Sequence, residues 1–533
     1  MNVQAASEVV PIGQVLRDSY VRFADRVAIT DDARSLTYAE LHDRARGIAA
    51  GLRRLGCAPG DRVVLLSPNR CEWVEVDHAC YLGGFVRVAP LTRLHPRELN
   101  RIVADADPTV IVAEGEWLDG AGRDWIPAGV RHLITIGERP GTSGSLEDLY
   151  EPGTDDEFPP ADLDTPCWIM YTSGSTGAPK GVVCNHRSVG AMTRGTLAEM
   201  TARADLGTDD VAVHTAPLGH WGGSIALALY AVGGTNILEK SFDAERLAAM
   251  LDSGRITVLP LVPTQINMLV EVLAGKAAAG APVDVSRVKL LPYAGSAIAP
   301  DRLAKAQEVF GQIMLQFYGS SEALTPVTTL RPEDHVTTVS SGGLPRLASA
   351  GKQAPFSEVA VVGPDGAPLP PGETGEITTR GAHVMPGYWR LPDATAEVLN
   401  ADGWVRTGDM GYLDDHGFLF IVDRKKDMIV TGGFNVYPRE VENAISTLAG
   451  VREVTVVGAP SERWGEAITA IVVPVPGVTL TKESVVDHCR QQIAGYKVPK
   501  EVLFRDELPK SGTGKILKHD IRDALWQGRT RKV

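Results

Sequence analysis

The hydrophobic positions near the start of the chain switch between helical and strand spacing. Residues 37–56, TYAELHDRARGIAAGLRRLG, place their apolar side chains on one helical face after a capping box formed by Thr37 and Glu40. The apolar run RVVLLS follows at 62–67, then another helical stretch, then FVRVAPL at 85–91. This order of helix, strand, helix and strand predicts an α/β fold with parallel strands.

The same alternation continues toward the middle of the chain. Strand-like runs TVIVAE, HLITIG, CWIMYTSGS, VAVHTAPL and ITVLPLVPT begin at residues 109, 132, 167, 211 and 256. Each run ends in a loop rich in Gly, Pro, Ser or Thr. Because ligands of open α/β sheets bind beyond the carboxyl ends of the strands, these loops are where we expect the ligand.

Beyond residue 340 the pattern changes to short strands with Gly-Asp turns, as in GPDGAPLPPGETGEITTRG and GDMGYLDDHGFLFIVDR, which predicts an antiparallel subdomain. After the charged run DRKKD at 423–427 the pattern becomes α+β again. We therefore predict a large α/β N-terminal domain over 1–423, with parallel and mixed sheets flanked by helices plus a small antiparallel subdomain. A small α+β C-terminal domain over 424–533 follows it.

Composition limits the possible classes of protein. A chain of 533 residues is long enough for at least two domains, and its net charge of −13 argues against a nucleic-acid or anionic-membrane binder. The most apolar stretch, 224–232, is shorter than the ~20 residues of a membrane span. Six cysteines without a C-x-x-C pair predict buried thiols in a reducing compartment, and the N-terminus lacks a secretion signal. We expect a cytoplasmic protein, and both a monomer and a homodimer remain open.

Residues 171–181, YTSGSTGAPKG, predict a phosphate-binding loop. Its glycines let the backbone approach a ligand closely, its hydroxyls are short donors, and Lys180 adds a mobile positive charge. The Walker pattern G-x-x-x-x-G-K-[ST], counted from Gly174, fails at Pro179 and Gly181. The loop is therefore a phosphate-binding loop of another kind.

Three further stretches accompany this loop: QFYGSSEA at 316–323, GWVRTGD at 403–409 and PKSGTGKILK at 509–518. In this order and spacing the four resemble the motifs of the adenylate-forming (AMP-binding) superfamily, which includes acyl-CoA synthetases, amino-acid-activating domains of peptide synthetases and beetle luciferases. The resemblance runs from about Leu36 to Lys518. It implies activation of a carboxylic acid by ATP and Mg²⁺ to an acyl-adenylate with release of pyrophosphate, followed by transfer to the thiol of coenzyme A.

The resemblance also implies roles for individual residues in nucleotide binding. Tyr318 matches the aromatic that stacks on adenine, Asp409 the acid that accepts hydrogen bonds from both ribose hydroxyls, and Arg424 its ribose and phosphate partner. Glu322 matches the magnesium ligand. The expected nucleotide-binding set is Thr172, Ser173, Gly174, Ser175, Thr176, Gly177, Lys180, Gly295, Ser296, Ala297, Tyr318, Gly319, Ser320, Asp409, Arg424 and Lys515.

Catalysis is assigned by the same resemblance to Lys515, Glu322, Thr176 and His220. Lys515 matches the lysine that bridges the carboxylate and the α-phosphate. Because that lysine lies in the C-terminal domain, the domain is expected to be mobile, with its hinge near Lys426. Coenzyme A is expected to pass Gly432 and Gly433 and to contact Trp464.

The acyl pocket is expected at Gly219, His220, Trp221, Gly222 and Gly295. Relatives that activate α-amino acids carry an Asp in the segment HTAPLGHWGGS, and this chain has none, which favours an acid without that amine. Gly219 stands where many acyl-CoA synthetases have an aromatic residue. The missing ring and the neighbouring glycines predict room for a bulky or long apolar acid.

Three other functions remain open from the sequence. An acyl-AMP ligase that loads the phosphopantetheine arm of a carrier protein shares every motif, so a carrier protein is the alternative partner. An oxygenase of the luciferase type shares the adenylation motifs. The non-enzymatic alternative is a nucleotide-binding sensor or scaffold, which has no reason to place Lys515 and Glu322 in these motifs.

Overall fold

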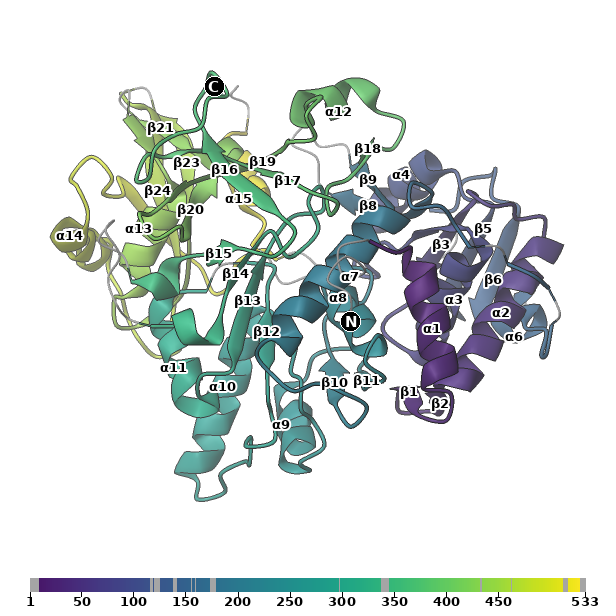
Figure 1. Ribbon diagram of the computed structural model, residues 1–533. Coiled ribbons are helices and arrows are strands. Elements are labelled where there is room, and N and C mark those ends of the chain that lie inside the picture. Colours follow the sequence, from purple (N-terminus) through teal and green to yellow (C-terminus); the bar gives the residue numbers. More distant parts are fainter. Residues whose placement is uncertain are drawn as a thin grey trace.

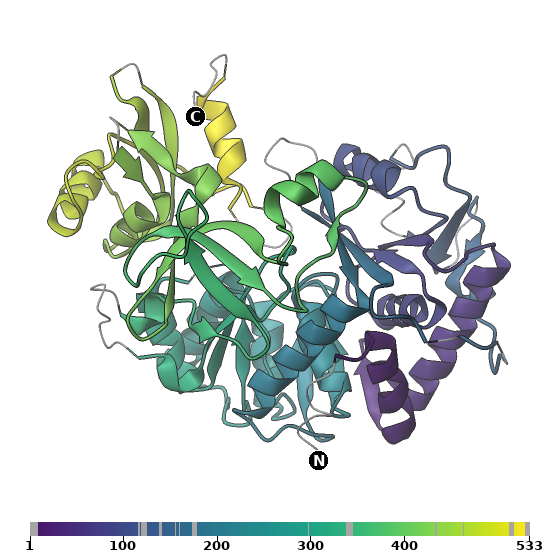
Figure 2. The same cartoon turned by 45° about the horizontal axis from the view of Figure 1, so that its top comes forward.

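The computed structural model of the chain describes residues 9–115, 118, 125–137, 141–154, 156–158, 160–172, 179–296, 298–336, 345–431, 434–461, 463–510 and 516–527. Figure 1 shows a large N-terminal domain of sheets and helices and a smaller C-terminal domain, which Figure 2 shows beside the antiparallel sheet of the N-terminal domain. The predicted fold class is confirmed.

The first sheet of the N-terminal domain is mixed, with strand order β18-β9-β8-β4-β3-β5-β6-β7. The pairs from β8 through β7 are parallel, as predicted, whereas β9 pairs antiparallel with both β8 and β18. The chain therefore reverses direction between Thr172 and Lys180, which face each other at the ends of β8 and β9. The strands are β3 (Arg62–Leu66), β4 (Val86–Val88), β5 (Val110–Glu114), β6 (His132–Ile136), β7 (Gly144–Ser145), β8 (Pro166–Thr172), β9 (Lys180–Asn185) and β18 (Gly387–Tyr388).

The second sheet region consists of β2-β1-β11-β10 and β12-β13-β14-β15. Isolated bridges of Val258 to Ala212 and Leu290, and of Leu261 to Tyr293, connect the two. The strand predicted from residue 256 is thus reduced to single bridges, because Pro260 has no N–H for a ladder. The strands are β1 (Val27–Thr30), β2 (Ser35–Thr37), β10 (Val211–His214), β11 (Thr235–Leu238), β12 (Leu291–Tyr293), β13 (Met314–Tyr318), β14 (Thr328–Leu330) and β15 (Lys352–Gln353).

Helices fill the space between these sheets and cover their outer faces. Side chains of α7 and α8 contribute both to the core under the first sheet and to the core under β10 and β13, so these two helices lie between the sheets. Residues of α9, α10 and α11 cover the far face of the second sheet, and α4 covers that of the first. The helices are α1 (Ile12–Arg22), α2 (Tyr38–Arg54), α3 (Cys71–Gly83), α4 (Pro96–Ala106), α6 (Leu146–Leu149), α7 (His186–Thr201), α8 (Gly222–Tyr230), α9 (Ala244–Asp252), α10 (Pro263–Ala278) and α11 (Pro300–Phe310).

Helix α2 forms as its pattern predicts. The Thr37 side chain accepts a hydrogen bond from the Glu40 backbone N–H, and the Glu40 carboxylate accepts one from the Thr37 N–H, at 2.7 Å. The apolar face from Leu41 to Leu52 is buried against α3 and the first sheet. Two local rules, the cap and the helical period, therefore determine this element without help from the rest of the fold.

The remaining elements complete the predicted antiparallel subdomain and the C-terminal domain. The subdomain is the sheet β16-β17-β19-β20 with helix α12, and β20 leads through a short 3₁₀ turn, Lys425–Asp427, into β21 of the C-terminal sheet. The elements are β16 (Glu358–Val362), β17 (Gly375–Arg380), α12 (Pro392–Val398), β19 (Val405–Leu413), β20 (Leu419–Arg424), β21 (Ile429–Thr431), β22 (Phe434–Val436), α13 (Pro438–Ser446), β23 (Val451–Ser461), β24 (Gly465–Pro474), α14 (Lys482–Gln492), β25 (Glu501–Phe504) and α15 (Lys518–Leu525).

All six cysteines are buried free thiols, as predicted. Every helix in the described part of the chain is too short or too polar to cross a bilayer. The domain boundary between 423 and 424 stays a prediction, with the change of sheet falling close to it.

Histidines in the core of the protein are held neutral. Burial lowers the pKa of His78 to about 3 and that of five further histidines to about 4. At His335 burial outweighs the bond that its Nδ1–H donates to the Arg331 carbonyl at 2.7 Å, and in the neutral ring Nε2 accepts from the Tyr293 hydroxyl at 2.9 Å. The five are His42, His186, His214, His335 and His383.

We expect the protein to lose stability steeply below pH 6.5. Because these pKa values lie below the value of about 6.5 of an unfolded chain, the unfolded state takes up protons first as the pH falls. The histidine contribution is complete above pH 6.5 and is lost as the pH approaches 4, on the order of 2 kcal/mol for each deeply buried histidine by pH 5 and less for the partly exposed His42. Burial raises the pKa of Asp77 to about 6, so this carboxyl takes up its proton first in the folded state and favours folding as the pH falls. The effect of this one group is smaller than that of the six histidines. Thermal unfolding between pH 7.5 and 5 measures the effect, and a constant melting temperature would contradict it.

Candidate active site

The carboxyl ends of the parallel strands β12 and β13 lie side by side and carry two of the predicted loops. Gly295 and Ser296 follow β12 and are exposed, with Gly295 at φ 95°, a region that disfavours other residues. Tyr318 ends β13, and a Cβ on the next residue, Gly319, would lie 2.9 Å from the Ala323 carbonyl oxygen. Both glycines are therefore required by the turns that present this edge to a ligand.

Tyr318, Asp409 and Arg424 come together from two different sheets. The Tyr318 hydroxyl donates to one carboxylate oxygen of Asp409 at 2.7 Å, and Arg424 Nε lies 2.6 Å from the other. Asp409 on β19 and Arg424 on β20 are paired in register, which fixes the ion pair. Asp409 is 4% exposed, whereas the Arg424 side chain is 47% exposed. The carboxylate raises the pKa of the Arg424 guanidinium, so this group is a permanent cation with part of its surface open to a ligand.

Glu322 and Lys180 meet at a residue that the sequence did not single out, Tyr388 on β18. The Tyr388 hydroxyl donates to Glu322 Oε1 at 3.0 Å, and Lys180 Nζ lies 5.1 Å from the centre of the Tyr388 ring. Antiparallel pairing of β18 with β9 brings Tyr388 to this position, far from both partners in the sequence. The carboxylate predicted for the metal and the cation predicted for phosphate therefore border one site.

The donor set at Glu322 fits Mg²⁺. A carboxylate is a hard oxygen donor, and Mg²⁺ in nucleotide sites takes one or two carboxylates and completes its shell with phosphate and water. Among the residues that the structure describes, no three His, Cys, Asp or Glu side chains converge as a metal cluster. An ion at Glu322 would therefore depend on the nucleotide for further ligands.

The acyl segment, residues 214–224, runs from the end of β10 to the first turn of α8. Its glycines are packed against protein. A Cβ on Gly219 would lie 3.1 Å from Ala89 Cβ, one on Gly222 3.2 Å from the Ala216 carbonyl oxygen, and one on Gly223 2.4 Å from the Leu218 carbonyl oxygen. The glycines serve a tight chain reversal. The prediction that their missing side chains leave room for a bulky acid is therefore wrong in its reason, because protein atoms lie next to each of these positions. His220 is partly buried, and the Trp221 ring lies 6.5 Å from that of Phe317.

This packing changes the effect expected of Gly219→Phe. A ring at this position must displace Ala89 or the whole acyl segment, and overpacking of this kind costs roughly 1–3 kcal/mol. We expect a lower melting temperature and a similar loss of kcat/KM for small and large acids. Thermal unfolding and kinetics with one small and one large acid test this. A loss confined to the large acid would instead mean that the ring enters the acyl pocket.

On the C-terminal domain, exposed aromatic and basic side chains gather near the predicted path of coenzyme A. Trp464 is 37% exposed and lies under two cations, with Arg463 4.6 Å and Lys500 5.8 Å from its ring centre. The exposed rings of Phe434 and Tyr496 are 4.8 Å apart, and Thr431 pairs with both Phe434 and Gly465, next to Trp464. The aromatic–basic patch, as we name it, consists of Arg463, Phe434, Trp464, Tyr496 and Lys500.

The predicted hinge residue Lys426 lies in the 3₁₀ turn between β20 and β21. Several other predicted residues are not among those that the structure describes. Outside the described residues lie Ser173, Gly174, Ser175, Thr176, Gly177, Ala297, Gly432, Gly433 and Lys515. Tyr388, Tyr496 and Lys500 were not predicted from the sequence, because an isolated aromatic or basic residue carries no periodic or motif signal, whereas Phe434 and Arg463 are sequence neighbours of the predicted Gly433 and Trp464.

Comparison with known proteins identifies relatives over nearly the whole length. The family model "AMP-binding enzyme" matches residues 16–389, and the model "AMP-binding enzyme C-terminal domain" matches residues 440–515. A feruloyl-CoA synthase of Amycolatopsis sp. is 37% identical over 93% of this chain and 95% of its own length, and an indoleacetate–CoA ligase of Aromatoleum aromaticum is 36% identical over 94% and 95%. The structure of the amide bond synthetase McbA of Marinactinospora thermotolerans superimposes with a TM-score of 0.85 at 29% identity, covering 96% of this chain and 99% of that one.

Proposed function

The chain belongs to the adenylate-forming family of AMP-binding enzymes and is an AMP-forming acid–thiol ligase, and from this premise we propose that it converts a bulky, apolar carboxylic acid to its coenzyme A thioester. The observation that carries the site assignment is the cluster of Tyr318, Asp409 and Arg424. It combines an aromatic ring, a buried carboxylate and a half-exposed guanidinium, the groups that a nucleoside monophosphate requires.

In the first half-reaction, a carboxylate oxygen of the acid attacks the α-phosphorus of ATP. A P–O bond forms there as the bond to the β-phosphate breaks, and pyrophosphate leaves. Lys180 and the loop before it would hold the β- and γ-phosphates, and Asp409 would accept hydrogen bonds from the ribose hydroxyls. Mg²⁺ held by Glu322 would neutralise phosphate charge. Lys515 would bridge the acid and the α-phosphate, where negative charge accumulates.

In the second half-reaction, the thiol of coenzyme A attacks the acyl carbon. The C–S bond forms, the C–O bond to AMP breaks, the thiol proton is released and AMP departs. We propose that the C-terminal domain turns at Lys426 so that Gly432 and Gly433 border the thiol. The aromatic–basic patch supports this assignment, because an exposed indole flanked by two cations suits an adenine ring that carries phosphates.

The acid is proposed to be aromatic or otherwise bulky and apolar. Feruloyl-CoA synthase and indoleacetate–CoA ligase, both named for aromatic acids, are relatives at 37% and 36% identity. The acyl segment contains no carboxylate that could hold an α-ammonium group, and it places Trp221 beside Phe317. The buried thiols support a reducing compartment, and we propose the cytoplasm.

Pyrophosphate release with ATP and Mg²⁺ tests this function. The panel of acids contains ferulate, indoleacetate, a polycyclic acid, fatty acids of increasing length and phenylalanine. We expect release with aromatic or other bulky apolar acids and none with phenylalanine, whose ammonium group has no partner in the acyl segment. Each active acid is then incubated with coenzyme A or with a phosphopantetheinylated carrier protein.

The product identifies the acceptor. An acyl-CoA supports the proposal, whereas a loaded carrier protein without acyl-CoA would identify an acyl-AMP ligase for carrier proteins. If ATP binds but no acid of the panel releases pyrophosphate, the proposed acid class is wrong. If phenylalanine is the best substrate, the proposed acid class is wrong.

A further inference from the structure

Asn69, in the loop between β3 and α3, holds the acyl segment from 145 residues away in the sequence. Its side-chain amide donates to the carbonyl oxygens of His214, at 3.2 Å, and Ala216, at 2.9 Å. Its carbonyl oxygen accepts from the Leu218 N–H at 3.0 Å. With 4% of its surface exposed, Asn69 makes these bonds away from competing water, where each counts more than on the surface. One side chain thus fixes alternate backbone groups over the first half of the acyl segment.

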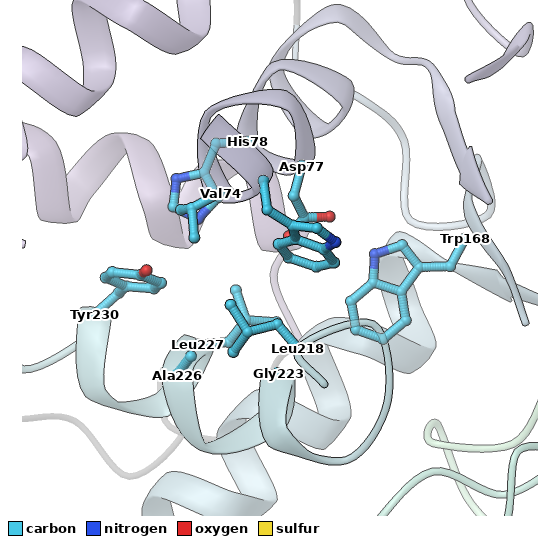
Figure 3. A pocket seen from close by; sticks show the side chains of 10 residues that line it. Val74, Asp77, His78, Trp168, Leu218, Gly223, Ala226, Leu227 and Tyr230 are labelled. Carbon is cyan, nitrogen blue, oxygen red and sulfur yellow. The ribbon is translucent and has the colours of Figure 1, made fainter. Parts of the chain in front are cut away.

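Behind this segment the packing leaves a cavity. Figure 3 shows side chains of α3, including Val74, Asp77 and His78, facing Leu227 and Tyr230 of α8 across it, and Leu218 and Gly223 of the acyl segment also line it. The cavity is small, so the segment is packed against α3 over most of this face. His214 is also held in the β10–β11 ladder and Leu218 in the core, so Asn69 adds side-chain hydrogen bonds along the path between them, at Ala216 and Leu218.

A second buried group, the guanidinium of Arg87, lies against the acyl segment where the chain turns at Gly219. Arg87 on β4 is 1% exposed and pairs with Asp77 at 2.9 Å, and its guanidinium lies over the rings of Trp73 and Trp168. A Cβ on Gly219 would lie 3.6 Å from Arg87 Nη1. The acyl segment thus rests on a fixed cation at Gly219 and is tied at its start by Asn69.

We propose that Asn69 is a positioning residue for the acid: it fixes residues 214–218 and, through them, the places of His220 and Trp221. This inference rests on the proposed function, in which the acyl segment lines the acyl pocket. The bonds of Asn69 reach His214, Ala216 and Leu218, so its effect on the places of His220 and Trp221 is transmitted through the backbone. Its loss should weaken binding of the acid far more than binding of ATP, because Tyr318, Asp409 and Arg424 lie on other strands.

The test is Asn69→Asp in the full-length protein. The substitution keeps the size and the acceptor for Leu218 but turns two donors into an oxygen that faces two carbonyl oxygens. With the best acid of the panel as the probe, we expect KM for the acid to rise about tenfold and KM for ATP to change less than about twofold. Hydrogen exchange of the peptide covering 214–224, measured without ligand, should accelerate at least about tenfold relative to wild type. Asn69→Ser is the second variant, should Asn69→Asp not fold.

Asn185→Asp is the matched control. Asn185 is also a buried asparagine, at 5% exposure, and its side chain accepts from the Ser188 N–H to cap α7. We expect it to leave both the ratio of the two KM values and exchange over 214–224 unchanged. The inference is overturned if the Asn69 variants raise both KM values equally, or if exchange over 214–224 stays at the wild-type rate. Failure of wild type to activate any acid would overturn the proposed function instead, and the exchange rates would still decide whether Asn69 fixes the segment.

Discussion

Lys515→Ala is expected to slow formation of the acyl-adenylate by about 10²–10³-fold, the cost of removing one preorganised group that stabilises charge in the transition state. Thioester formation from supplied acyl-AMP should stay within about twofold of wild type. The reason is that the resemblance places this lysine at the acid and the α-phosphate in the first half-reaction alone. In the second, the thiol attacks an acyl-adenylate that already exists.

Two assays separate the half-reactions: pyrophosphate release with acid and ATP, and acyl-CoA formation from synthetic acyl-AMP and coenzyme A. Lys510→Ala is the control, because Lys510 belongs to the same stretch but its ammonium group pairs with Glu453 at 2.8 Å. It should change neither rate by more than about twofold. Equal losses in both half-reactions for Lys515→Ala would contradict the proposed rotation of the C-terminal domain.

Asp409→Asn is expected to raise KM for ATP by roughly 10- to 100-fold, since hydrogen bonds to a charged group contribute about 1.5–3 kcal/mol. The amide keeps the size of the carboxylate but loses the charge that faces Arg424 and the full acceptor set for two ribose hydroxyls. Arg424 is half-exposed and can be solvated, so the fold should survive. Equilibrium binding of ATP, measured without acid, is the direct readout.

Asp414→Asn provides a matched comparison in the same hairpin. Asp414 is 3% exposed, and its carboxylate accepts from the backbone N–H groups of His416 and Phe418 at 2.9 and 2.8 Å, in the turn between β19 and β20. This variant should lower the melting temperature and leave ATP affinity unchanged. If both variants weakened ATP binding alike, Asp409 would act through the hairpin and would have no place in the nucleotide site.

The local rules of the sequence were sufficient for the elements and for the order of the site motifs. The Thr37 capping box and the helical period determine α2, and apolar runs bounded by turn residues determine β3, β5 and β8. Asp409 and Arg424 were selected through the resemblance to the adenylate-forming family, Asp409 by its motif and Arg424 by its distance after Asp409. These features depend on neighbours close along the chain, which is the information that a single sequence carries directly.

Contacts between segments far apart in the sequence decided how the site residues are brought together and what fills the space around them. Tyr388 lies beside Glu322 and Lys180, and Asn69 bonds the acyl segment; both contacts join residues far apart in sequence. Gly219 shows the difference most clearly: the sequence showed a missing ring and predicted open space, whereas Ala89, just after β4, lies 3.1 Å from where a Cβ of residue 219 would be. A sequence determines which side chain is absent, but only the packing of the other strands determines what occupies the volume, because close-packed interiors leave few voids.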